Sequence, residues 1–142
     1  MKLIFQLTSD QRAIHFIDEV MNNFVNLYQL PQGRELCFAV HELVINAVEV
    51  MKKSEKEKDT ITVTIIHKND RVIVTVLDRG MGIEEQTISK ILELDSQNIS
   101  FSERGRGLFF VQNMVDKLWF ENQKNEFFLV GISKSLNRLQ SN

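Results

Sequence analysis

Apolar residues along the chain recur with two different periods. Over residues 2–7 apolar and polar positions largely alternate, which predicts a half-buried strand. Residues 11–30 and 34–51 repeat apolar side chains every three or four positions, the period of an amphipathic helix. Pro31 separates these two patterns. The first third of the chain therefore predicts a strand followed by two helices.

The second half of the chain predicts two antiparallel hairpins. Residues 60–67 and 71–77 alternate and are rich in β-branched side chains, and the Asn and Asp between them tolerate tight-turn geometry. Residues 117–123 and 126–135 form a similar pair around a Lys-Asn turn. We expect the strands of each pair to lie side by side in one sheet.

Two helical patterns lie between these hairpins, at residues 84–94 and 108–116. The polar residues 95–104 between them show no period, which indicates a loop. The order of elements predicts the α+β class: a two-layer α/β sandwich whose mostly antiparallel sheet carries helices on one face.

Composition narrows the class of protein. A length of 142 residues fits a single domain, residues 1–142, and the net charge of −2 provides no basic field for direct binding of nucleic acid or an anionic membrane. The one cysteine cannot form an internal disulfide, and no apolar run is long enough for a signal peptide or a membrane span. We therefore expect a cytoplasmic protein that does not act at a membrane.

Glu42 and Asn46 lie four positions apart on the second predicted helix, so they project from one face about one turn apart. A carboxylate can accept a proton, and an amide oxygen can ligate a hard cation. Two solvated polar residues on an amphipathic helix would show the same spacing. The pair indicates chemistry only in combination with other segments.

Asp78, Gly80 and Gly82 follow directly on the strand predicted at 71–77. Glycines at a strand end let the backbone approach a flat ligand, and an Asp beside them can accept a hydrogen bond from an exocyclic amine such as that of adenine. The alternative interpretation is a simple turn in which Asp78 accepts from backbone N–H groups.

Gly105 and Gly107 precede the helix predicted at 108–116. The free N–H groups of a helix N-terminus suit phosphate, and Arg104 and Arg106 add positive charge. A flexible connection that leads into a helix is the alternative. The common phosphate-binding motif G-x-x-x-x-G-K-[ST] does not occur in the sequence.

Together these three segments match the needs of a nucleoside triphosphate. Such a ligand requires a group that reads the base, a metal-bound clamp for the phosphates and a general base that activates the attacking oxygen. The sequence therefore predicts one site for a nucleoside triphosphate.

The same three motifs resemble those of a known superfamily. They are similar to the N, G1 and G2 boxes of the GHKL ATPases, whose domain has the Bergerat ATP-binding fold. Their order and the small size of the chain most resemble the bacterial anti-sigma-factor serine/threonine kinases. The motifs are Glu42-x-x-x-Asn46-Ala47, Asp78-x-Gly80-x-Gly82 and Gly105-Arg106-Gly107-Leu108.

The resemblance implies a role for each of these residues. Asn46 would ligate a Mg²⁺ ion that bridges the phosphates, Glu42 would be the general base toward a serine hydroxyl, and Asp78 would bind the adenine amine. The residues expected to contact ATP are Asn46, Asp78, Gly80, Gly82, Arg104, Gly105, Arg106, Gly107 and Leu108.

The resemblance also implies protein partners. Kinases of this kind phosphorylate a small antagonist protein, an anti-anti-sigma factor, on serine. They also bind an RNA polymerase sigma factor and form homodimers. By that resemblance, the chain would be an anti-sigma factor that switches between these two partners.

One position departs from the resemblance. These kinases often carry a His four residues after the metal-binding Asn, where this chain has Val50. The alternative function is therefore a nucleotide-gated protein-binding switch with little or no phosphoryl transfer. The ATP-binding half of a histidine kinase would need a dimerising helical pair with its own phosphorylated His, for which we expect no room in the chain.

Overall fold

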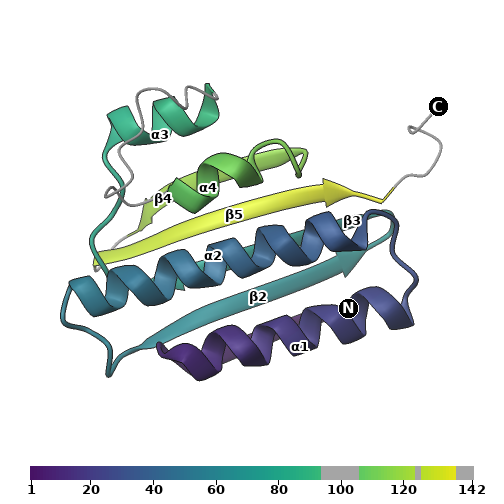
Figure 1. Ribbon diagram of the computed structural model, residues 1–142, viewed down its shortest axis with the longest axis horizontal. Coiled ribbons are helices and arrows are strands. Elements are labelled where there is room, and N and C mark those ends of the chain that lie inside the picture. The colour runs from purple at the N-terminus through teal and green to yellow at the C-terminus, as the bar shows by residue number, and fades with distance from the viewer. Residues whose placement is uncertain (94–105, 124–125, 137–142) are drawn as a thin grey trace.

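The computed structural model describes residues 1–93, 106–123 and 126–136, and its elements follow the order expected from the sequence (Figure 1). Their bounds are β1 Lys2–Thr8, α1 Gln11–Leu27, α2 Gly33–Lys53, β2 Thr60–Lys68, β3 Arg71–Asp78, α3 Glu85–Leu92, α4 Arg106–Val111, β4 Lys117–Gln123 and β5 Phe127–Ser135.

Five strands form one antiparallel sheet with the order β1-β2-β3-β5-β4. The two predicted hairpins are its β2–β3 and β5–β4 pairs, and β5 also pairs with β3. Figure 1 shows α1 and α2 crossing the same face of this sheet. The prediction of an α+β sandwich with an antiparallel sheet is therefore confirmed.

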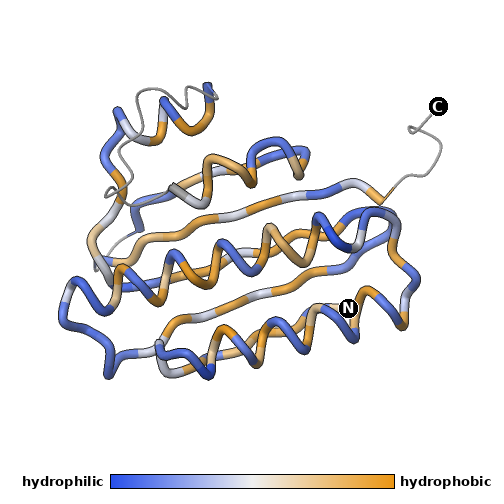
Figure 2. Tube along the Cα trace, in the orientation of Figure 1, coloured by the Kyte–Doolittle hydropathy of each residue, from blue (hydrophilic) through white to orange (hydrophobic). Residues whose placement is uncertain are grey.

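The core lies between the sheet and the apolar stripes of the helices. Each long helix turns one stripe inward, with Ile17 and Met21 of α1 and Leu43 of α2 fully buried. Strands contribute alternate residues, such as Ile61 and Val63 of β2. Figure 2 shows the result as helices with alternating blue and orange turns beside largely orange strands. Within the described residues, no helix combines the length and apolar character needed to cross a bilayer.

A polar pair connects the outer edges of α1 and α2. His41 Nδ1 lies 2.8 Å from an Asp18 carboxylate oxygen, and both side chains are half-buried. Cys37 lies one turn before His41. Burial, and then the negative charge of Asp18, raise the pKa of its thiol. The thiol therefore stays protonated at neutral pH, as expected for a residue that mainly packs.

Helix α4 ends earlier than the sequence pattern predicts, at Val111 instead of residue 116. The backbone that follows binds elsewhere: the Met114 carbonyl accepts a hydrogen bond of 2.6 Å from Lys134 Nζ, and the Asp116 N–H donates to the Ser133 carbonyl over 2.9 Å. These contacts with β5 take up backbone groups that a longer helix would use internally. The prediction of a helix through residue 116 was wrong for this reason.

Candidate functional site

One stripe of α2 carries the residues around which the candidate site is built. Glu42, Asn46 and Val50 follow one another at four-residue intervals, so they lie about 6 Å apart along the helix axis. Asn46 and Val50 are buried, with 9% and 3% of their surface exposed, and Glu42 is half-buried. The stripe therefore faces other parts of the molecule along its whole length.

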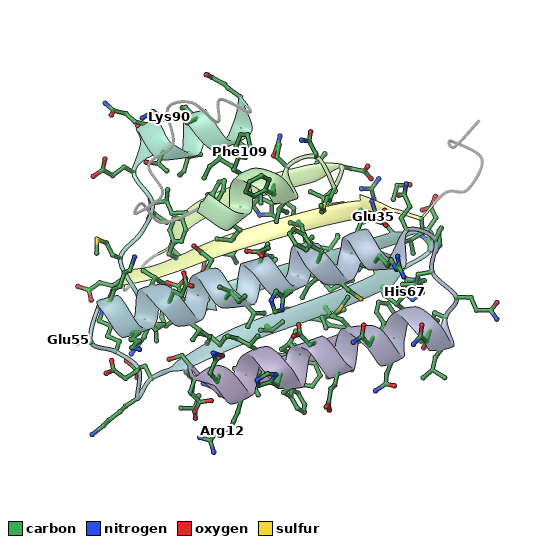
Figure 3. The ribbon with its side chains drawn as sticks, viewed as in Figure 1. Arg12, Glu35, Glu55, His67, Lys90 and Phe109 are labelled. Atoms are coloured by element: carbon green, nitrogen blue, oxygen red, sulfur yellow. The ribbon has the colours of Figure 1, made fainter. Side chains whose placement is uncertain are left out.

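At one end of the stripe, Glu42 meets the start of α4. A Cβ atom on Gly107 would overlap Oε2 of Glu42 and would lie 3.1 Å from its Cδ. The carboxylate thus rests against the first turn of α4, where unpaired helix N–H groups favour a negative charge. In Figure 3, Phe109 marks α4 beside α2, between Glu35 near the start of α2 and Glu55 just beyond its end.

At the other end, Val50 meets the segment that follows β3. A Cβ atom on Gly80 would lie 2.7 Å and 2.9 Å from the two methyl groups of Val50, and 3.1 Å from its backbone carbonyl carbon. Gly80 does not have the positive φ that favours glycine. Its requirement for glycine is the close approach of its backbone to Val50, whereas the sequence predicted an approach to a flat ligand.

Asp78 ends β3 and is almost completely buried, with 1% of its surface exposed. Its Oδ1 accepts a hydrogen bond of 2.9 Å from the N–H of Gly80. This is the turn geometry that the sequence offered as the alternative interpretation. Because Gly80 contacts Val50, the turn also joins Asp78 to the stripe of α2.

The segment 79–82 is held by residues that the sequence interpretation missed. Lys56 Nζ donates to the Arg79 carbonyl over 2.8 Å, and the Met81 N–H donates to Ser54 Oγ over 3.1 Å. The Arg79 N–H points at Met51 Sδ, 3.2 Å away. Residues 52–59 are a mixed-charge run, which gives no sequence signal for such contacts.

A cavity of about 530 Å³ lies beside this segment, at one end of the sheet. The loop after α2 contributes Lys56, the segment after β3 contributes Met81, and the ends of β4 and β5 contribute Asn122 and Phe128. Its volume falls in the range of small-molecule and cofactor sites. Apolar and polar groups therefore meet next to the two glycines, Gly80 and Gly82.

The structure describes only some of the remaining candidate residues. Leu108 is fully buried in the core beneath α4, which leaves only its backbone to face a ligand. Arg104 and Gly105 lie outside the described residues, as does the loop predicted at 95–104. The side chain of Arg106 also lies outside them, although its backbone begins α4.

The donor set beside the stripe suits a magnesium ion shared with a ligand. Asn46 could supply an amide oxygen to such an ion, and the carboxylate of Glu42 lies one turn away. Among the residues that the structure describes, no three His, Cys, Asp or Glu side chains come together to hold a metal. Mg²⁺ on nucleotides usually takes most of its ligands from phosphate oxygens and water, so a single amide oxygen from the protein is compatible with it.

Comparisons with known proteins agree on the type of domain. A family model described as a histidine kinase-like ATPase domain matches residues 7–130. A probable C4-dicarboxylate sensor kinase of Halalkalibacterium halodurans is 30% identical over 106 residues, which is 75% of this chain but 20% of that protein. The chain thus spans about a fifth of the length of this curated relative.

A solved structure shares the fold. A chain of the SiaB–SiaC complex from Pseudomonas aeruginosa matches 93% of this chain and 88% of its own length, with a TM-score of 0.62 and 14% sequence identity. At this identity, the likeness shows the architecture alone.

Proposed function

The chain belongs to the histidine kinase-like ATPase domain family, and on this basis we propose that residues 1–142 form one ATP-binding domain that acts as a protein serine/threonine kinase. We further propose that it binds ATP with Mg²⁺, phosphorylates an anti-anti-sigma protein and sequesters an RNA polymerase sigma factor as an anti-sigma factor. A homodimer that works in the cytoplasm, where such partners act, is part of the same proposal.

The observation that carries this proposal is the convergence of two segments on one stripe of α2. Gly107, at the start of α4, contacts Glu42, and Gly80, held by Asp78, contacts Val50. Asn46 lies between these two contacts on the same helix. The candidate general base, the candidate metal ligand and the contacts with both glycine segments thus lie along about 12 Å of one helix.

Four of the candidate residues each have a task in this proposal. Mg²⁺, when bound, neutralises charge on the phosphates, and Asn46 would help to hold it. Glu42 accepts the proton of the substrate serine as that oxygen attacks the terminal phosphorus and ADP leaves. Asp78 accepts a hydrogen bond from the adenine amine, and Gly107 gives phosphate oxygens access to the first turn of α4.

A protein partner is supported by the solved neighbour. In that crystal structure SiaB is in complex with SiaC, so a chain of this fold has been seen in a two-protein assembly. The resemblance to anti-sigma-factor kinases supplies the finer identities, namely the antagonist protein and the sigma factor.

Val50 favours a second candidate function. Where the resembling kinases often have a His, this chain places two buried methyl groups against Gly80, so that position offers no titratable group. A nucleotide-gated protein-binding switch, with little or no phosphoryl transfer, is therefore the alternative.

The test compares Glu42→Gln with Glu49→Gln. Both residues are glutamates of α2, but Glu49 is exposed. Each variant is incubated with labelled ATP, Mg²⁺ and the proteins encoded by neighbouring genes, and phosphoserine is measured. We expect Glu42→Gln to lose transfer by about 100-fold or more while ATP affinity is kept, because a general base contributes at least that factor. Glu49→Gln should match the unmodified protein.

Two results would contradict parts of this proposal. Transfer that persists in Glu42→Gln at the unmodified rate would show that Glu42 is not the base. ATP binding without any transfer by the unmodified protein, together with nucleotide-dependent capture of a partner, would establish the switch instead.

A further inference from the structure

The N-terminal part of α2 continues the stripe of Glu42 away from the cavity. Phe38 precedes Glu42 by four residues and Glu35 precedes Phe38 by three, so these side chains lie on one side of the helix. Along the helix axis, Phe38 lies about 6 Å and Glu35 about 10 Å from Glu42. Phe38 keeps 40% of its surface exposed, and Glu35 is exposed as well. Figure 3 shows Glu35 near the start of α2, at the opposite end from Glu55.

Helix α4 places a second exposed aromatic side chain beside the same part of α2. Phe110 follows Gly107 by three residues, which puts both on one side of α4, and Gly107 faces the Glu42 carboxylate. The two helices pack together and run in opposite directions (Figure 1), so one turn after Gly107 lies beside the turn before Glu42. Phe110 therefore lies toward Phe38, and 53% of its surface is exposed.

The chemistry of phosphoryl transfer restricts the direction from which a substrate can approach Glu42. In the proposed site, the nucleotide lies along the stripe from Glu42 toward Asn46 and Val50. The attacking and leaving oxygens lie roughly in line across the transferred phosphorus, so the serine enters from the side opposite ADP. That side of Glu42 holds the exposed rings of Phe38 and Phe110.

Apolar and acidic groups lie side by side along this approach. Aromatic residues are enriched at the centres of protein interfaces, where a partner covers their apolar surface. Glu35 adds a negative charge beside the rings, and it forms no ion pair with any other residue that the structure describes. The surface therefore suits a segment that combines an apolar side chain with a positive charge.

We propose that Phe38 and Phe110 determine the specificity of the proposed kinase for its protein substrate. The two rings bind an apolar side chain close to the phosphorylated serine, and Glu35 binds a lysine or arginine beyond it. An extended chain advances about 3.3 Å per residue, so the apolar residue lies about two positions from the serine and the basic residue about three, on the same side. This inference rests on the proposed function, because it takes Glu42 as the base toward serine.

The test measures KM for the acceptor protein and the affinity for ATP separately. The acceptor is the protein encoded by a neighbouring gene that gains phosphoserine when it is incubated with the unmodified chain, ATP and Mg²⁺. The variants are Phe38→Ala, Phe38→Leu and Phe110→Ala, and Phe16→Ala is the matched control. Phe16 is 43% exposed, much like Phe38, but it lies on α1 and packs edge-on against Phe5.

We expect Phe38→Ala and Phe110→Ala each to raise KM for the acceptor about tenfold, because each removes apolar area that the substrate covers. Phe38→Leu should stay within about threefold of the unmodified chain, since an apolar side chain remains. ATP affinity, measured by calorimetry, should not change in any of these variants. Phe16→Ala should leave both quantities unchanged.

A second pair of variants tests the charge. Glu35→Gln should raise KM for the acceptor about threefold at low salt, and this difference should vanish at about 1 M salt, where exposed charges are screened. Glu49→Gln is the control, because Glu49 is an exposed glutamate of the same helix on the other side of Glu42. It should not change KM for the acceptor at either salt concentration.

An acceptor KM that is unchanged in both Phe38→Ala and Phe110→Ala would overturn this inference and leave the proposed kinase standing. A matching loss of ATP affinity in these variants would also overturn it, because the rings would then act on the nucleotide site. Failure of the unmodified chain to transfer phosphate to any neighbouring protein would overturn both proposals. The two failures are therefore distinguishable in the same set of assays.

Discussion

At Gly107, a glutamate carboxylate occupies the space that a side chain would need. The nearest atoms to a Cβ at this position belong to Glu42, and they are the far end of a flexible side chain. A small side chain at residue 107 can therefore be accommodated, but only if the Glu42 carboxylate moves away from α4. The position of the Glu42 carboxylate thus depends on residue 107 having no side chain.

We predict that Gly107→Ala folds normally and transfers phosphate more slowly. The free energy of unfolding, measured with denaturant, should change by about 1 kcal/mol or less. The higher helix propensity of Ala than of Gly should offset the cost of moving the Glu42 carboxylate. The transfer rate should fall about tenfold or more, because small displacements of a catalytic group are costly.

The control for this prediction is the double variant Gly107→Ala/Glu42→Gln. If the alanine acts by displacing Glu42, it should cause no further loss once the carboxylate is gone. If Gly107→Ala slowed transfer by the same factor in the Glu42→Gln background as in the unmodified protein, Gly107 would act in some other way.

At the scale of secondary-structure elements, α2 organises the site because one of its stripes contacts two separate segments. The contact with the segment after β3 is apolar: the methyl groups of Val50 pack on the backbone of Gly80. Further hydrogen bonds, from Lys56 to Arg79 and from Met81 to Ser54, fix the same segment to the loop that follows α2. This end of the site is therefore more constrained than a glycine-containing turn alone would be.

We predict that Gly80→Ala lowers the free energy of unfolding by about 1–3 kcal/mol, because the new methyl overlaps a buried side chain and approaches the backbone behind it. Val50→Ala should also destabilise the protein, since it removes buried methyl groups. The double variant should lose less free energy of unfolding than the sum of the two single losses, by about 0.5 kcal/mol or more, as measured by denaturant titration. Strictly additive losses would mean that the two residues do not share this contact.

The elements themselves were largely predictable because their periods are local. Alternation and helical spacing predicted the strands and the two long helices within a few residues, since each buries one regular face. The end of α4 was not predictable, because Lys134 and Ser133 of β5 hold the backbone beyond Val111. Such contacts depend on tertiary structure and leave no pattern in the local sequence.

The site was predictable in part. Glycine and acidic motifs could be found from their spacing, and the structure brings Glu42 to Gly107 and Gly80 to Val50. Lys56 and Asn122 could not be found in this way, since each is a single polar residue outside any motif. Their positions follow only from the packing of loops and the register of β4 against β5.

At the scale of the whole molecule, the order of strands explains how distant segments meet. β3 lies in the middle of the sheet, so its end brings Asp78 and Gly80 beneath α2. The chain then continues through α3 and α4 before β4 and β5 complete the sheet, and α4 packs beside α2 (Figure 1). One face of α2 thus borders both glycine segments, whereas the opposite face of the sheet carries contacts such as that of Gly131 with Trp119.

The most direct test of this account is a titration of the ¹⁵N-labelled chain with ATP and Mg²⁺, followed by two-dimensional NMR. The account predicts that the backbone amides of Gly80, Gly82 and Gly107 and the side-chain amide of Asn46 shift together along one saturation curve, while Gly131 does not move. Shifts confined to one of these segments, or saturating at different concentrations, would contradict a single nucleotide site on α2.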